Sequence, residues 1–264
     1  MSMTRRLRSF VEPAATALLF FVVWELFCRV LSIPEFVLPT PSKTVLTLIK
    51  DWDLIWPNAQ QTLITTLLGF CISVVFGMAL GVLVGSSDFL NRCLSPLLVA
   101  FNSVPKVAVV PVLVLWFGIG TVPAVITAFV LSFFPITVNV AAGVAATDRE
   151  LIDVLLSLGA SRTDIVIKAG IPRSLPYFFA SLKIAITLAF VGSVIAETVA
   201  SNSGIGYLML SASASFKIPL VFASLLFIGF LGVSMYAVTA FFETRLTSWN
   251  INSGDQTANF ATGG

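Results

Sequence analysis

The chain has 264 residues, of which 57% are hydrophobic and 11% charged, and its formal net charge is +2. A soluble domain carries about 25% charged residues, so this composition excludes a water-facing surface and predicts an all-α integral membrane protein. Histidine, the commonest metal ligand and general base, is absent, which weighs against an enzyme. The three cysteines form no C-x-x-C pair, and no basic run indicates nucleic-acid binding.

Six segments are apolar and long enough, at about 20 residues, to cross the hydrocarbon core as helices. In chain order they are residues 13–31, 62–85, 94–117, 121–146, 177–200 and 220–242. The first contains Glu25 and Arg29, which are four residues apart and close enough to pair on one helix face. The proline-rich connection 32–61 is expected to cover the outer surface, with a short helix near residues 43–50. The connection 201–219 is expected to dip back into the bundle.

The second span carries a ridge of small residues. Its members are spaced four apart: Gly69, Ser73, Gly77, Gly81 and Gly85. Such a ridge lets another helix backbone approach closely. The favoured interpretation is packing within the subunit, and the alternative is a seam against a second subunit or a moving helix.

Lys106 lies well inside the third span, where a charge is costly and usually faces a cavity or a partner. Asn102, one helical turn earlier, would share its face if the helix continues through Pro105. Asn139 is a second polar amide at depth, in the fourth span. These three residues are predicted to line a translocation path, with Lys106 favouring an anionic solute. The alternatives are that Lys106 pairs with a buried acid or lies near an interface; Glu197 is interpreted as an interfacial residue.

Residues 146–176 form a polar island between the fourth and fifth spans. Its charged members are Asp148, Arg149, Glu150, Asp153, Arg162, Asp164, Lys168 and Arg173. Leu151, Val154, Leu155 and Leu158 recur at helical spacing and predict a short amphipathic helix, which Gly159 ends as a C′ glycine. A second short helix, residues 161–168, is predicted to run to Gly170 and Pro172. The polar face carries both signs of charge, unlike a membrane-surface helix, so it is predicted to meet a soluble partner.

The distribution of basic residues predicts the orientation, because Lys and Arg are enriched in cytoplasmic loops. With the amino terminus inside, the cytoplasmic set is Arg5, Arg6, Arg8, Arg92, Arg149, Arg162, Lys168, Arg173 and Arg245, and the external set is Lys43, Lys50 and Lys217. Both termini and the polar island are therefore predicted to be cytoplasmic.

The polar island resembles the E-A-A-x3-G-x9-I-x-L-P loop of the permease subunits of binding-protein-dependent ABC importers. Asp153-Val154-Leu155 stand at the opening triplet, and Gly159 and Pro172 match the glycine and the proline. Further stretches resemble the nitrate/sulfonate/taurine-type branch: residues 36–41 (FVLPTP), 104–108 (VPKVA), 115–120 (LWFGIG) and 203–208 (SGIGYL). The resemblance covers about residues 36–242.

The resemblance implies about six transmembrane helices with a cytoplasmic coupling-helix loop between the fourth and fifth, in the bacterial inner membrane. It implies a cytoplasmic amino terminus (1–12), a transmembrane permease domain (13–250, with the coupling loop 147–176) and a tail (251–264) whose polar composition predicts disorder. The implied contacts with the ATPase are Asp153, Leu155, Leu158, Gly159, Ala160, Ser161, Arg162 and Pro172.

The implied partners are a dimer of ATP-binding subunits, an external solute-binding protein, a second permease copy and membrane lipids, with no nucleic acid. The sequence contains no G-x-x-x-x-G-K-[ST] loop, so ATP and Mg belong to the partner and this chain needs no cofactor. The implied solute is small and anionic, of the sulfonate, nitrate, aromatic-acid or pyrimidine-precursor class. The alternative function is an ion-gradient-driven secondary transporter, which would need ionisable groups at mid-membrane, where only Lys106 plainly lies.

Overall fold

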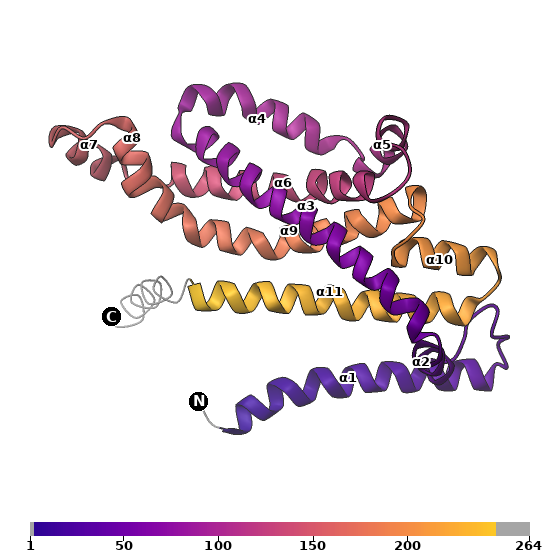
Figure 1. Cartoon of the computed structure of the whole chain (residues 1–264). Coiled ribbons are helices and arrows are strands. Elements are labelled where there is room, and N and C mark those ends of the chain that lie inside the picture. The colour runs from indigo at the N-terminus through magenta and orange to yellow at the C-terminus, as the bar shows by residue number, and fades with distance from the viewer. Residues whose placement is uncertain (1–2, 247–264) are drawn as a thin grey trace.

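The computed structural model describes residues 3–246, and every regular element within them is a helix (Figure 1). The helices are α1 (Met3–Val30), α2 (Pro41–Lys50), α3 (Trp52–Ser86), α4 (Asp88–Ser103), η1 (Lys106–Val109), α5 (Val110–Phe117), α6 (Thr121–Ala145), α7 (Arg149–Ser157), α8 (Arg162–Ile165), η2 (Val166–Gly170), α9 (Ile171–Ala200), α10 (Ile205–Ala214) and α11 (Ile218–Leu246). The all-α prediction is confirmed. The predicted tail, residues 251–264, lies outside the described part of the chain.

Four helices are long and apolar enough to cross a membrane: α3, α6, the continuous helix from α8 through η2 to α9, and α11. A fifth span is obtained if α4 and the η1–α5 segment, which meet at an angle of 81°, count as one broken crossing. The predicted first span, residues 13–31, lies in α1 except for its last residue, and α1 is 28 residues long. The structure therefore supports four or five spans in the described residues, and the predicted number of six is not established.

The centre of the bundle is the packing of α3 against α6 and of α6 against α9. The small-residue ridge of α3 faces α6: a Cβ atom added to Gly81 would lie 2.7 Å from Val140 Cβ, and one added to Gly69 would lie 2.5 Å from Ala128 Cβ. Ser73, in the same row, hydrogen-bonds Ser132 of α6. The ridge thus packs within the subunit, as the favoured interpretation had it.

The third predicted span does not form one helix, because α4 ends at Ser103 and η1 begins at Lys106. Val104 is extended (ψ 128°), as the residue before a proline usually is, and Pro105 remains extended (ψ 102°). Pro105 therefore does more than kink this span, because the helix ends before it. The helix does not continue through Pro105, so the condition under which Asn102 and Lys106 would share one helical face is not met.

The second helix of the polar island also differs from its prediction, since it does not stop near Gly170 and Pro172. α8 passes through the π turn η2 into α9, so the helix that contains the fifth span begins at Arg162 rather than at residue 177. The Ile171 N–H bonds to the Val166 carbonyl, five residues back. Pro172 follows directly, in the first turn of α9. It has no N–H to donate, but the backbone hydrogen bonds of the helix have already changed there from four residues back to five.

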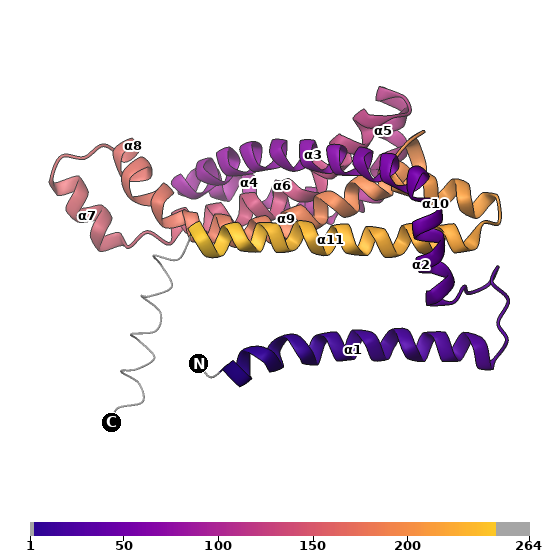
Figure 2. The ribbon, with the colours of Figure 1, turned by 60° about the horizontal axis from the view of Figure 1, so that its bottom comes forward.

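The two ends of the bundle carry different elements. α1 begins and α11 ends at the end from which α7 and α8 project, whereas α2, α5 and α10 lie at the opposite end (Figures 1 and 2). α2 is the predicted short helix of the connection 32–61. α10 is the segment expected to dip back, and its buried residues Ile205 and Leu208 share one hydrophobic cluster with Ile55 of α3 and Leu220 of α11.

Candidate coupling segment and transport pathway

The polar island forms a hairpin of two short helices, α7 and α8, which we call the coupling hairpin (residues 149–165). α7 ends in a Schellman motif: the Gly159 N–H bonds the Leu156 carbonyl at 2.9 Å and the Ala160 N–H bonds the Leu155 carbonyl at 3.0 Å. Gly159 has φ +85°, a left-handed conformation that glycine adopts without strain. The predicted C′ role of Gly159 is confirmed.

The entry into α8 is fixed by a capping box. The Ser161 hydroxyl accepts the Asp164 N–H at 3.1 Å, and the Asp164 carboxylate accepts the Ser161 N–H at 3.2 Å. Lys168 adds an ion pair to the same carboxylate, at 3.0 Å. With both helix ends capped, the turn between α7 and α8 has a defined geometry, and a force on one helix reaches the other.

The apolar face of α7 is not buried within the chain. Leu158 at the tip is 78% exposed and Val154 is 55% exposed, while Leu155 is only half-buried. Beneath α7, a cavity of about 300 Å³ is bordered by Asp153 and Arg162 and by the ends of α3 and α6. Exposed apolar side chains with charged neighbours are typical of a surface that meets a protein partner.

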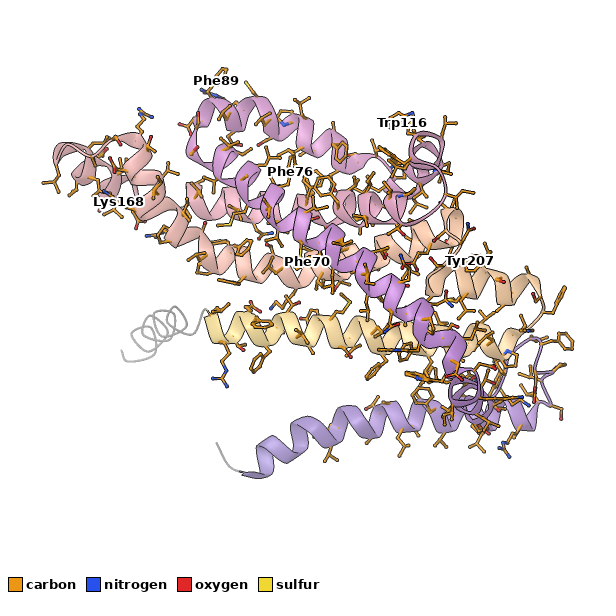
Figure 3. The ribbon with its side chains drawn as sticks, in the orientation of Figure 1. Phe70, Phe76, Phe89, Trp116, Lys168 and Tyr207 are labelled. Atoms are coloured by element: carbon orange, nitrogen blue, oxygen red, sulfur yellow. The ribbon has the colours of Figure 1, made fainter. Side chains whose placement is uncertain are left out.

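The coupling hairpin is attached to α9 at its base. Arg173, in the first turn of α9, forms an ion pair with Asp148, the N-cap residue of α7, at 2.8 Å. Of the residues predicted to contact an ATPase, Asp153 and Leu155 lie on α7, Leu158 to Ser161 form the turn, and Arg162 begins α8. Pro172 is separated from them by η2 and lies at the base. Lys168, on η2, is at the same end of the bundle (Figure 3).

Lys106 lies at the break between α4 and α5 and is half-buried. Its ammonium donates to the Asn102 carbonyl at 2.8 Å and to the Asn102 side-chain oxygen. Lys106 and Asn102 therefore meet through a turn of the chain rather than along a helix. The partner of Lys106 is Asn102 and not a buried acid, which was the alternative. Asn139 bonds the Pro135 carbonyl within α6 at 2.8 Å. Next to this break, α5 directs Trp116 away from the bundle (Figure 3).

Glu197 lies three residues before the end of α9, and its side chain is buried inside the protein, at 1% exposed. Its carboxylate accepts the Thr62 hydroxyl at 2.7 Å and the Gly206 N–H at 3.2 Å, and also the hydroxyls of Thr65 and Ser193 at 3.2 and 3.4 Å. These donors come from α3, α9 and α10. Sequence reasoning missed this cluster because its partners lie up to 135 residues away.

A second cross-link joins α9 to α11. Lys183 forms an ion pair with Glu243 at 2.6 Å, and both side chains are largely shielded from solvent. Glu243 lies one residue beyond the end predicted for the sixth span, so the pairing of Lys183 with Glu243 was not predicted from the sequence.

These features define a multi-pass helical membrane protein with a projecting hairpin suited to a partner. Residues 73–248 match the model of a known family, the binding-protein-dependent transport system inner membrane component. The chain belongs to this family and is the permease component, a non-catalytic membrane subunit, of an ABC importer whose ATPase is a separate subunit. The recognition made from the coupling loop is thereby confirmed.

Several curated proteins are similar over most of their length. The formylaminopyrimidine transport permease protein ThiX of Halalkalibacterium halodurans is 32% identical over 90% of this chain and 96% of its own. The riboflavin transport system permease protein RibX of Chloroflexus aurantiacus is 30% identical over 93% and 94%. The putative aliphatic sulfonates permease SsuC of Bacillus subtilis is 28% identical over 86% and 83%.

The fold is also similar to that of a solved transporter. A chain of the MetNI methionine ABC transporter in an inward-facing conformation superposes with a TM-score of 0.52, covering 71% of this chain and 98% of that one. The two sequences are 19% identical, so this likeness supports the fold alone.

Proposed function

We propose that this permease, paired with a second copy of itself, moves a small anionic solute that an external binding protein delivers. Two ATP-binding subunits would drive the movement by engaging the coupling hairpin. The observation that carries the proposal is the unburied apolar face of α7, around Val154 and Leu158, on a hairpin whose two ends are capped. Asp153 and Arg162 provide charged contacts beside it.

The coupling hairpin is proposed to lie in the cytoplasm, together with both termini, and residues 13–250 are proposed to form one permease domain. Two observations support this orientation. The basic residues predict it, and α1 begins and α11 ends at the end of the bundle that carries the hairpin (Figure 1). The opposite end, with α2, α5 and α10, would then face the binding protein.

The solute class is proposed from Lys106 rather than from the relatives, which are named for chemically different solutes. An ammonium has three N–H donors, and Asn102 takes two of them in this structure. The third is available to an anionic oxygen. Asn102 and Asn139 would add amide groups along the proposed path.

Replacing Lys106 by methionine is expected to lower uptake of an anionic solute. A hydrogen bond to a charged group contributes roughly 1.5–3 kcal/mol, which corresponds to a loss of about tenfold or more. Lys106→Arg keeps the charge and should retain most of the uptake. The measurement is the rate of solute uptake at equal amounts of assembled transporter, and an undiminished rate in Lys106→Met would contradict the proposed role.

The proposed energy source is tested in proteoliposomes that contain this chain. We expect uptake only when the ATP-binding subunits, the binding protein and ATP are all present, and we expect vanadate to inhibit it. The alternative, an ion-gradient-driven transporter, predicts uptake by this chain alone that is abolished by ionophores.

A further inference from the structure

The amino-terminal end of α10 is held by side chains from other helices. The first N–H groups of a helix have no partner inside that helix. Here the Gly204 N–H is accepted by Asn58 at 2.9 Å, the Ile205 N–H by the Thr62 hydroxyl at 2.9 Å, and the Gly206 N–H by Glu197 at 3.2 Å. The end of α10 is therefore attached to α3 and α9 by specific polar contacts.

Glu197 is the centre of this attachment. One carboxylate oxygen accepts Thr62 and Gly206, and the other accepts Thr65 and Ser193. A buried carboxylate is costly unless its oxygens are hydrogen-bonded, and Thr62, Gly206 and the Thr65–Ser193 hydroxyl pair, whose members also hydrogen-bond each other, meet that need. The same carboxylate thus joins α9 to both α3 and α10.

The glycines of this turn permit the close contact. A Cβ added to Gly204, whose φ is +102°, would lie 2.3 Å from the Glu197 carboxyl carbon. A Cβ added to Gly206 would lie 2.4 Å from the Val194 carbonyl oxygen of α9. Side chains at either position would push α10 away from α9. The hydrogen bonds of Glu197 to α10 therefore depend on these two glycines.

α9 is tied to its neighbours at three points along its length. Arg173 binds Asp148, the N-cap residue at the start of the coupling hairpin, Lys183 binds Glu243 of α11, and Glu197 binds the end of α10. Arg173 and Glu197 are separated by about 36 Å of helix at 1.5 Å per residue. A displacement at the hairpin can therefore reach α10 through one helix.

We propose that Glu197 is a positioning residue that fixes α10 to α9, so that α10 follows the movement which the coupling hairpin imparts to α9. This inference rests on the proposed function. Its physical basis is the number and placement of hydrogen bonds to Glu197, and a negative charge is not required.

Three substitutions separate positioning from a role of charge. Glu197→Gln keeps the reach and one acceptor oxygen for Thr62 and Gly206, while Thr65 and Ser193 can turn their hydroxyls to accept from the new amide. Glu197→Asp keeps the charge but is one methylene too short to reach the Gly206 N–H. Glu197→Ala removes every acceptor.

We expect ATP-driven uptake in Glu197→Gln to stay within about twofold of the parent, and uptake in Glu197→Ala to fall by about tenfold or more. Glu197→Asp should lie between them. If Glu197 instead carried an ion or a proton, Asp would transport better than Gln, and that order would overturn the proposal. Normal uptake in Glu197→Ala would overturn it as well.

A second readout reports the position of α10 directly and does not depend on transport. Ala212 is buried in α10, and Ser213 beside it is exposed. In a variant whose native cysteines are replaced, Ala212→Cys should resist a membrane-impermeant maleimide, and Glu197→Ala should increase its labelling rate by about tenfold. Ser213→Cys, the matched control, should be labelled equally in both backgrounds. Unchanged protection of Ala212→Cys in Glu197→Ala would contradict the positioning role.

The two proposals fail in different ways. If the parent chain shows no uptake dependent on ATP and the binding protein, the proposed function is wrong, whatever the labelling shows. If the parent transports but the Gln and Ala variants are equally impaired, only the role of Glu197 is wrong.

Discussion

Replacement of Gly159 by valine is expected to abolish ATP-driven uptake while the assembled transporter continues to hydrolyse ATP. Gly159 has φ +85° at the end of α7, a conformation that costs an ordinary residue roughly 1–2 kcal/mol and a β-branched residue more. Proline, whose φ is fixed near −65°, cannot adopt it. Either substitution would change the backbone conformation of the turn that joins α7 to α8, and Leu158 and Arg162 would be misplaced as a result.

A matched control separates backbone conformation from side-chain bulk. No atom lies within 4 Å of a Cβ added to Gly159, so a tolerated residue meets no obstacle there. Asparagine accepts left-handed conformations comparatively well, and Gly159→Asn should keep most of the uptake. Uptake and ATP hydrolysis are measured on the same proteoliposomes. If uptake and ATP hydrolysis stayed tightly coupled in Gly159→Val, this turn would not transmit force.

The substitution Gly81→Leu is expected to prevent assembly of the transporter rather than to uncouple uptake from ATP hydrolysis. Its Cβ would lie 2.7 Å from Val140 Cβ and 2.8 Å from the Thr137 carbonyl oxygen, distances that force α3 and α6 apart. Overpacking of this kind costs roughly 1–3 kcal/mol and occasionally more, so the amount of intact transporter extracted from membranes should fall by about tenfold.

Gly229, in α11, provides the control for Gly81. It borders the apolar cavity between α1, α2 and α11, and a Cβ added to it meets no atom within 4 Å. Gly229→Leu should therefore assemble normally. If Gly81→Leu also accumulated at the parental level, the close packing of α3 on α6 would be contradicted.

The local features of the coupling hairpin could be predicted from the sequence, because they depend on neighbouring residues. The spacing of the leucines in α7 and the glycine after it determine where that helix ends, and Gly159 performs the predicted role. The helix expected near residues 43–50 is α2, and the predicted fourth span differs from α6 by one residue at its end. Composition and periodicity are sufficient for such elements.

The remaining features depend on packing over long distances. Pro172 is typical of a helix boundary, yet the π turn η2 lets the helix continue past it. Lys106 has the expected companion, Asn102, but only because the chain bends at Pro105. The environment of Glu197 is formed by residues from three helices, so no window of sequence contains it.

Cross-linking from the tip of the coupling hairpin tests the central claim most directly. Leu158, 78% exposed, is replaced by cysteine in a variant without native cysteines, and an exposed cysteine at Ser213 serves as the control at the opposite end. We predict that the Leu158→Cys variant forms a cross-link to the ATP-binding subunit in membranes, that this link changes with nucleotide, and that Ser213→Cys forms none. Absence of the link from Leu158→Cys in a transporter that takes up solute, or labelling of that residue from the external side, would contradict the account.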